Sequence, residues 1–126
     1  MKLWLNLSLV ITLALFAVHE MDAMTHAEWR LLPVLSGLPE DVGRDGFVLL
    51  HIPLFAGVFW AVFLSPWKRL SAQIVSGLTI VHAIVHFLLS DHPLYTFVAP
   101  IETITVYGAA LSSAAYLAIS FLETSE

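Results

Sequence analysis

Four apolar runs constrain the fold of this chain more than any other feature of its sequence. They cover residues 3–18, 47–64, 70–90 and 103–122, and none contains Asp, Glu, Lys or Arg. About 20 apolar residues suffice for a helix to cross the hydrocarbon core of a bilayer. The whole chain is 59% hydrophobic and only 12% charged, with a mean hydropathy of +0.86. These values are typical of an integral membrane protein rather than a soluble domain.

The runs predict an all-α fold, a four-transmembrane-helix bundle that forms a single membrane domain over residues 1–126. Turn clusters and prolines between the runs place the helices at about 3–32, 46–64, 69–90 and 100–122. The first run follows Lys2 and also resembles a signal peptide, with Leu15-Phe16-Ala17 as a cleavage site. We favour a helix, because the sequence continues without a breaker to Leu32, before Pro33. This first helix would therefore extend beyond the membrane.

The basic residues indicate the topology. Four crossings put both termini on the side of the turn that contains Lys68 and Arg69. That side also holds Lys2, which makes three basic residues against Arg30 and Arg44 on the opposite side, so the positive-inside rule predicts cytoplasmic termini.

Polar residues gather at one level of this predicted bundle. His82 and His86 are four residues apart and share one helix face, as do His19, Asp22 and His26. At 1.5 Å per residue, the first and third helices place His19 and His86 roughly 6 Å below the outer boundary of a core about 30 Å thick. On the same scale His51 and Glu102 lie at about 7 and 5 Å, and His82 at about 12 Å. Such residues are costly in a membrane and by default face the bundle interior.

This layer predicts a metal centre, because imidazole and carboxylate groups are ligands for Zn, Fe, Mn and Cu, and helical bundles build such sites from facing helices. The candidate catalytic carboxylates are Glu102 and Glu20, the latter about 100° from the His19 face. HExxH is absent, which argues against a zincin protease. The candidate ligands are His19, Asp22, His26, His51, His82 and His86.

Other interpretations of the same residues remain open. A b-type haem would place His51 opposite His82 or His86 as axial ligands. A non-catalytic subunit would use the histidines and acids as a structural polar network. The segment with His26, Glu28 and Arg30 could also be a solvated helix face.

Several motifs carry a resemblance to a known family. They are the His-Glu-x-Asp-Ala run at 19–23, the later His-x-Glu-Trp-Arg, the His-Ile-Pro at 51–53, the His-x-x-x-His span and Glu102. Together they resemble an uncharacterised family of small bacterial four-helix membrane proteins and, more distantly, HXXEE-type membrane domains. The resemblance covers nearly the whole chain and implies no established activity. It does imply a multi-pass protein of the bacterial inner membrane.

Composition limits the partners. Without cysteine the chain offers no thiolate ligand and no Fe–S cluster. A net charge of −5 without a basic patch argues against nucleic acid. The lipid bilayer is the expected surrounding, and an apolar substrate such as a lipid or quinone is the expected small molecule. A homo-oligomer is left open.

Overall fold

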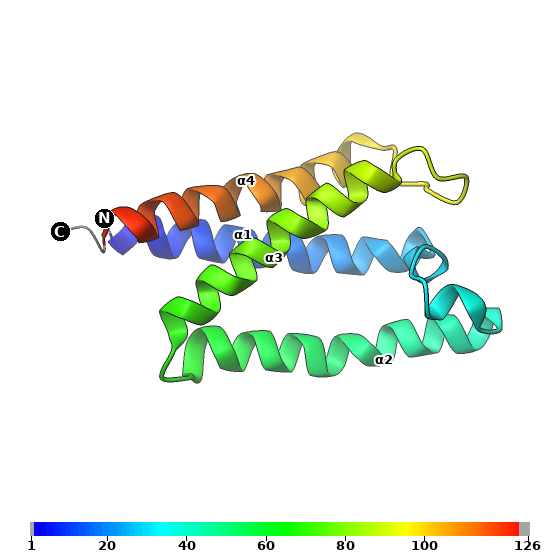
Figure 1. Cartoon of the computed structure of the whole chain (residues 1–126), viewed down its shortest axis with the longest axis horizontal. Coiled ribbons are helices and arrows are strands. Elements are labelled where there is room, and N and C mark those ends of the chain that lie inside the picture. The colour runs from blue at the N-terminus through cyan, green and yellow to red at the C-terminus, as the bar shows by residue number, and fades with distance from the viewer. Residues whose placement is uncertain (1, 124–126) are drawn as a thin grey trace.

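The computed structural model describes residues 2–123. Four long helices account for most of these residues, and each is long and apolar enough to cross a membrane. Figure 1 shows α1 and α4 side by side, α3 crossing them, and α2 standing apart from the other three. The all-helical, four-span architecture predicted from the apolar runs is confirmed. The helices are α1 (Lys2–Thr25), α2 (Glu40–Phe59), α3 (Lys68–Leu89) and α4 (Pro100–Leu122).

Side chains are distributed as in a membrane protein. Large apolar side chains point outward, such as Leu88 and Leu111, which are 72% and 74% exposed. Small hydroxyl side chains fill the interior instead, and Thr12 and Ser113 are fully buried. Small residues let helix backbones approach closely where lipid, rather than water, surrounds the outside.

Small residues determine how α1 packs on α4. The Thr12 hydroxyl lies 2.9 Å from that of Ser112 and accepts a longer hydrogen bond, 3.4 Å, from Ser113. Ser113→Leu should lower the free energy of unfolding by about 1–3 kcal/mol, because the larger side chain overpacks this contact. Ala114→Leu, on the exposed face next to it, should change stability little. Unfolding in mixed micelles measures both variants, and equal stabilities would contradict the packing described here.

The first helix ends earlier than the sequence predicts. We expected one helix to Leu32, but α1 ends at Thr25, and a 3₁₀ turn, η1 (Glu28–Arg30), follows. Between them Ala27 adopts a left-handed conformation with φ 52°. Trp29 is buried in the core that follows, so tertiary packing overrides the helix propensity of this segment.

The second helix begins earlier than expected, at Glu40 instead of near residue 46. Glu40 and Asp41 occupy its first turn, where carboxylates interact favourably with the helix dipole. Gly43, taken from the sequence as a loop residue, lies inside this helix. A Cβ there would stand 3.0 Å from the Leu35 carbonyl oxygen, so glycine permits the 3₁₀ turn η2 (Leu35–Gly37) to pack closely on α2.

Beyond Phe59, α2 widens into a π-helical segment, η3 (Trp60–Leu64), in which the backbone N–H of Ser65 donates to the Trp60 carbonyl over 2.9 Å. This wide turn places Val62 in the core that joins the helices at the end where α1 begins and α4 ends. A second core lies at the opposite end, and His19 on α1 and His51 on α2 lie between residues of the two cores. The first core contains Leu13, Val62, Ala72 and Tyr116, and the second contains Ala23, Trp29, Leu35, Phe47 and Phe97.

Candidate metal centre

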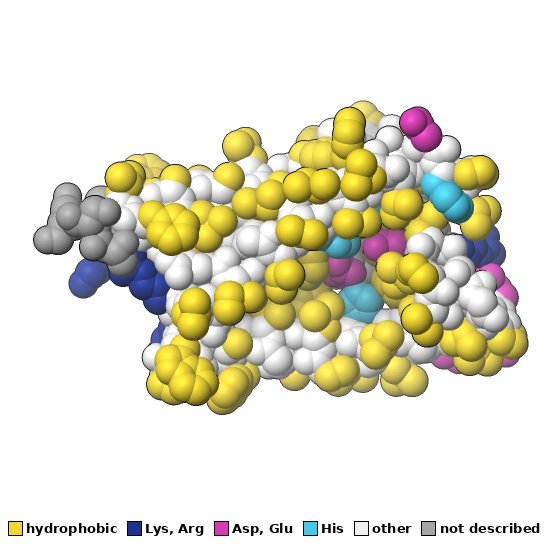
Figure 2. Space-filling view, viewed as in Figure 1, with side chains coloured by type: hydrophobic (Ala, Val, Ile, Leu, Met, Phe, Trp, Pro, Cys, Tyr) yellow, Lys and Arg dark blue, Asp and Glu magenta, His cyan; other side chains and the backbone are white. Residues whose placement is uncertain are grey.

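Three segments bring four potential metal ligands together. His19 comes from α1, Glu28 from η1, and His82 with His86 from successive turns of α3. One ligand atom from each residue lies within 4.8 Å of all the others. Figure 2 shows histidine and acidic side chains in the hollow between α3 and α2. The donor set of three imidazoles and one carboxylate fits a transition-metal ion.

Distances within this group match a shared ion better than a closed hydrogen-bond network. His19 Nε2 lies 3.7 Å from Glu28 Oε2, and His86 Nε2 lies 3.9 Å from Glu28 Oε1. Both distances exceed a hydrogen bond. Two ligands of a tetrahedral ion, each about 2.1 Å from it, stand roughly 3.4 Å apart. His19 Nε2 and His82 Nε2 are closer, at 2.9 Å, so one imidazole donates to the other here. An ion would require these two rings to separate slightly.

Two buried polar atoms of the group have no hydrogen-bond partner among residues 2–123. They are Nδ1 of His19, a residue only 1% exposed, and Oε2 of Glu28. A buried polar atom without a partner costs about 1–3 kcal/mol. Burial, together with the nearby Glu20 carboxylate, also raises the pKa of Glu28 from its usual 4.5 to about 7. A cation bound between His19 Nε2 and Glu28 would give Glu28 Oε2 a partner and favour the charged form of the carboxylate.

Tyr95, in the loop before α4, supports the orientation of His86. Its hydroxyl lies 3.2 Å from His86 Nδ1. Burial raises the pKa of Tyr95 to about 12, so the phenol keeps its proton at physiological pH. The phenol oxygen can still accept the Nδ1 proton, which leaves Nε2 of His86 as the nitrogen directed at Glu28. Partners of this kind fix the tautomer and ring direction of metal-binding histidines.

The left-handed turn at Ala27 places Glu28 in the group. Ala27→Val should lower the free energy of unfolding by about 1–3 kcal/mol, since β-branched residues tolerate positive φ poorly. Ala27→Gly should preserve stability within about 1 kcal/mol, because glycine adopts this conformation readily. Chemical unfolding of both variants measures the difference. Equal destabilisation by valine and glycine would show that the side chain, not the backbone, matters here.

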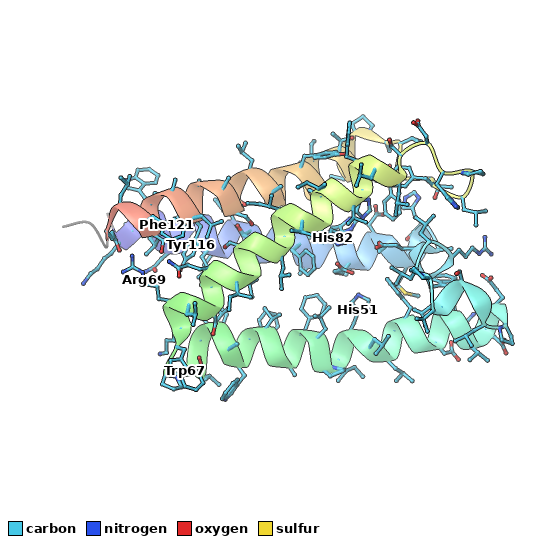
Figure 3. The ribbon with its side chains drawn as sticks, viewed as in Figure 1. His51, Trp67, Arg69, His82, Tyr116 and Phe121 are labelled. Atoms are coloured by element: carbon cyan, nitrogen blue, oxygen red, sulfur yellow. The ribbon has the colours of Figure 1, made fainter. Side chains whose placement is uncertain are left out.

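A second pair lies beside this group and links α1 to α2. His51 Nε2 stands 2.7 Å from Glu20 Oε2, while Nδ1 lies 2.6 Å from the Phe47 carbonyl oxygen. A carbonyl can only accept, so Nδ1 carries a proton. The contact with Glu20 then needs another proton, held by the imidazole or by the carboxyl group. Figure 3 shows His51 directed from α2 towards the other helices.

A third group joins α1 to the start of α4. His26 Nε2 lies 2.7 Å from Glu102 Oε1 and 3.6 Å from Asp22 Oδ2. Its Nδ1 contacts the Thr96 hydroxyl at 2.9 Å, and the other Glu102 oxygen accepts the backbone N–H of Ala99. Both ring nitrogens of His26 and both oxygens of Glu102 thus have partners. The group has metal-ligand geometry, but its hydrogen bonds already satisfy these atoms.

The structure therefore divides the predicted site residues into three groups. His19, His82 and His86 come together, as we expected, but their fourth member is Glu28, which was not among the predicted ligands and for which a solvated helix face was one open interpretation. Asp22, His26 and Glu102 form a separate group, and Glu20 pairs with His51. Because His51 is held by Glu20 and Phe47 rather than facing His82 or His86, this arrangement does not favour the haem interpretation.

Comparisons with known proteins identify the family but no activity. Residues 5–123 match the model of a family of unknown function, DUF6713, so the chain belongs to that family. No curated protein and no solved structure matches the chain significantly.

Proposed function

We propose that this member of DUF6713 is a membrane metalloprotein that binds one transition-metal ion at His19, Glu28, His82 and His86. The observation that carries the proposal is the convergence of these four donors, from three segments, within 4.8 Å. Three of the four residues, His19, Glu28 and His86, are buried.

The donor set favours particular ions. Imidazole nitrogen suits Zn, Fe, Cu and Ni, whereas Mg and Ca prefer a shell made entirely of oxygen. Three imidazoles and one carboxylate are therefore proposed to hold zinc or iron, with manganese or copper as further candidates. A metalloenzyme would keep one coordination position open to substrate, as catalytic metal sites generally do.

Catalysis by such a centre would need a proton carrier nearby. The metal, when bound, would polarise an oxygen of its substrate. The Glu20–His51 pair is the proposed proton carrier, because the contact between its two side chains holds a proton that either group can keep. Glu102 is a weaker candidate for this role, since both of its oxygens already have partners.

We place the centre towards the non-cytoplasmic side of the bacterial inner membrane. Lys2, Lys68 and Arg69 lie at the end of the molecule where α1 and α3 begin and α4 ends, and basic residues concentrate on the cytoplasmic side. The metal centre lies towards the other ends of α1 and α3. Cysteine accessibility labelling of both ends would test this orientation.

Metal analysis of the purified protein tests the proposal. Protein expressed in metal-replete medium and purified in detergent without chelator should contain about one equivalent of a transition metal. Less than roughly 0.1 equivalent, with no uptake of added Zn²⁺ or Fe²⁺, would contradict it. An absorption spectrum of the same sample serves as a control, because a Soret band would identify a haem protein instead.

A further inference from the structure

Two cavities meet beside the candidate metal centre. One, of about 270 Å³, is bordered by Glu28 and His86, and the other, of about 170 Å³, extends between α3 and α2. Leu78 and His82 line both cavities, so the two cavities adjoin along α3. We call the two cavities together the α3 groove. Its other lining residues are Leu31, Leu32, Val81, Val85 and Leu89 in the first cavity, and Phe16, Leu54, Val58, Val75 and Thr79 in the second.

The α3 groove is polar at one end only. Glu28, His82 and His86 lie at the metal end, and among residues 2–123 Thr79 is the only other polar residue that lines the groove. From His86 to Val75 is eleven positions on one helix, or about 16 Å. The volumes, 270 and 170 Å³, together lie in the range of small-molecule sites, about 300–1,000 Å³.

The walls of the groove are continuous with the lipid-facing surface. Leu54 on α2 and Leu78 and Val81 on α3 are 43%, 61% and 54% exposed, although they lie in predicted membrane spans. Figure 2 shows the hollow between α3 and α2 bordered by apolar side chains, with acidic and histidine side chains inside it. A molecule dissolved in the bilayer can therefore reach the metal end from the side.

We propose that the α3 groove binds a single-chain amphiphile whose oxygen-bearing end coordinates the metal and whose hydrocarbon chain lies along α3. The inference rests on the proposed function, because the metal supplies the attraction for the oxygen. It narrows the expected apolar substrate, a lipid or quinone, to a membrane-dissolved molecule with one long chain and an oxygen-bearing end. The polar end of the ligand would lie at the metal end of the groove, where Glu28, His82 and His86 offer charged or coordinating groups.

The test uses Co²⁺ as a spectroscopic probe of the centre in nanodiscs. Acetohydroxamate and a twelve-carbon alkyl hydroxamate are titrated separately, and the change in cobalt absorption reports binding. The dissociation constant of the short probe is calculated from its concentration in water. That of the long-chain probe is calculated from its concentration in the bilayer. The long-chain probe should bind wild-type protein more tightly than the short one.

Blocking the groove provides the decisive comparison. Leu78→Trp should weaken the long-chain probe by at least about 10-fold and leave the short probe within about two-fold. Ile74→Trp is the matched control, because Ile74 is exposed one turn away on α3 and lines neither cavity. Val81→Trp replaces Leu78→Trp if that variant does not bind cobalt. Equal effects of blocking and control variants on the long-chain probe would overturn the groove assignment.

The experiment separates the two proposals. Absence of cobalt absorption in the wild-type protein would overturn the metal centre, and the amphiphile assignment with it. Normal cobalt binding, with equal affinities for long and short probes, would overturn only the amphiphile assignment.

Discussion

Glu28→Gln should weaken metal binding by more than about 100-fold, a loss expected when a charged ligand is removed, since even the partners of ligands contribute 10- to 100-fold. The amide keeps the shape of the side chain but loses its negative charge. Competition with a fluorescent chelator measures the affinity. Glu40→Gln is the matched control, because Glu40 is exposed and paired with Arg30, away from the centre.

The same substitution should stabilise the metal-free protein. Burial raises the pKa of Glu28 to about 7, so the folded state binds more protons than the unfolded state between about pH 4.5 and 7. Stability therefore falls as pH rises through this window. Above it, Glu28→Gln should raise the free energy of unfolding by about 2–3 kcal/mol. A metal-free variant less stable than the wild type at pH 8 would contradict this account of Glu28.

Glu102→Ala should lower the free energy of unfolding by about 2–4 kcal/mol without weakening the metal centre. The carboxylate accepts the Ala99 N–H at the start of α4 and binds His26, and each lost contact contributes to the total. Glu102→Gln should lower the free energy of unfolding by less than half as much, because the amide group can still form one of the two contacts, with the Ala99 N–H or with His26. Unfolding in mixed micelles and cobalt titration measure the two properties.

The cobalt titration decides whether Glu102 belongs to the metal centre. It contributes no donor atom to the group of His19, Glu28, His82 and His86, so the affinity of that group for Co²⁺ should change less than about three-fold. A large loss of metal with little loss of stability would instead make Glu102 part of the centre.

Sequence predicted the layer of polar residues better than the contacts within it. Four apolar runs were enough to give four spans, and the four-residue spacing was enough to put His82 and His86 on one face. The depths estimated from sequence could not distinguish the three groups of side chains, because all three groups lie within a few helical turns of one another. Pairing depends on how α1 is rotated towards α2, α3 and α4, and no local pattern fixes that rotation.

Glu28 shows why the fourth donor could not be predicted. Glu28 lies nine positions after His19, so in a straight helix the two side chains would point about 180° apart, to opposite faces. The left-handed conformation of Ala27 redirects it inward. Alanine is a strong helix former, and no glycine or asparagine marks this position, so the local sequence favours continuation of the helix. The turn arises because Trp29 and Glu28 are buried against other elements.

The wide turn at the end of α2 also determines which way that helix faces. Its five-residue hydrogen-bonded loop, closed between Ser65 and Trp60, accommodates one residue more than a regular turn. Deleting a residue there would restore ordinary winding and rotate the preceding helix by about 100°. His51 would then swing away from Glu20 even though neither residue had changed. One extra residue in the wide turn, at the far end of α2, thus sets the direction in which His51 faces Glu20.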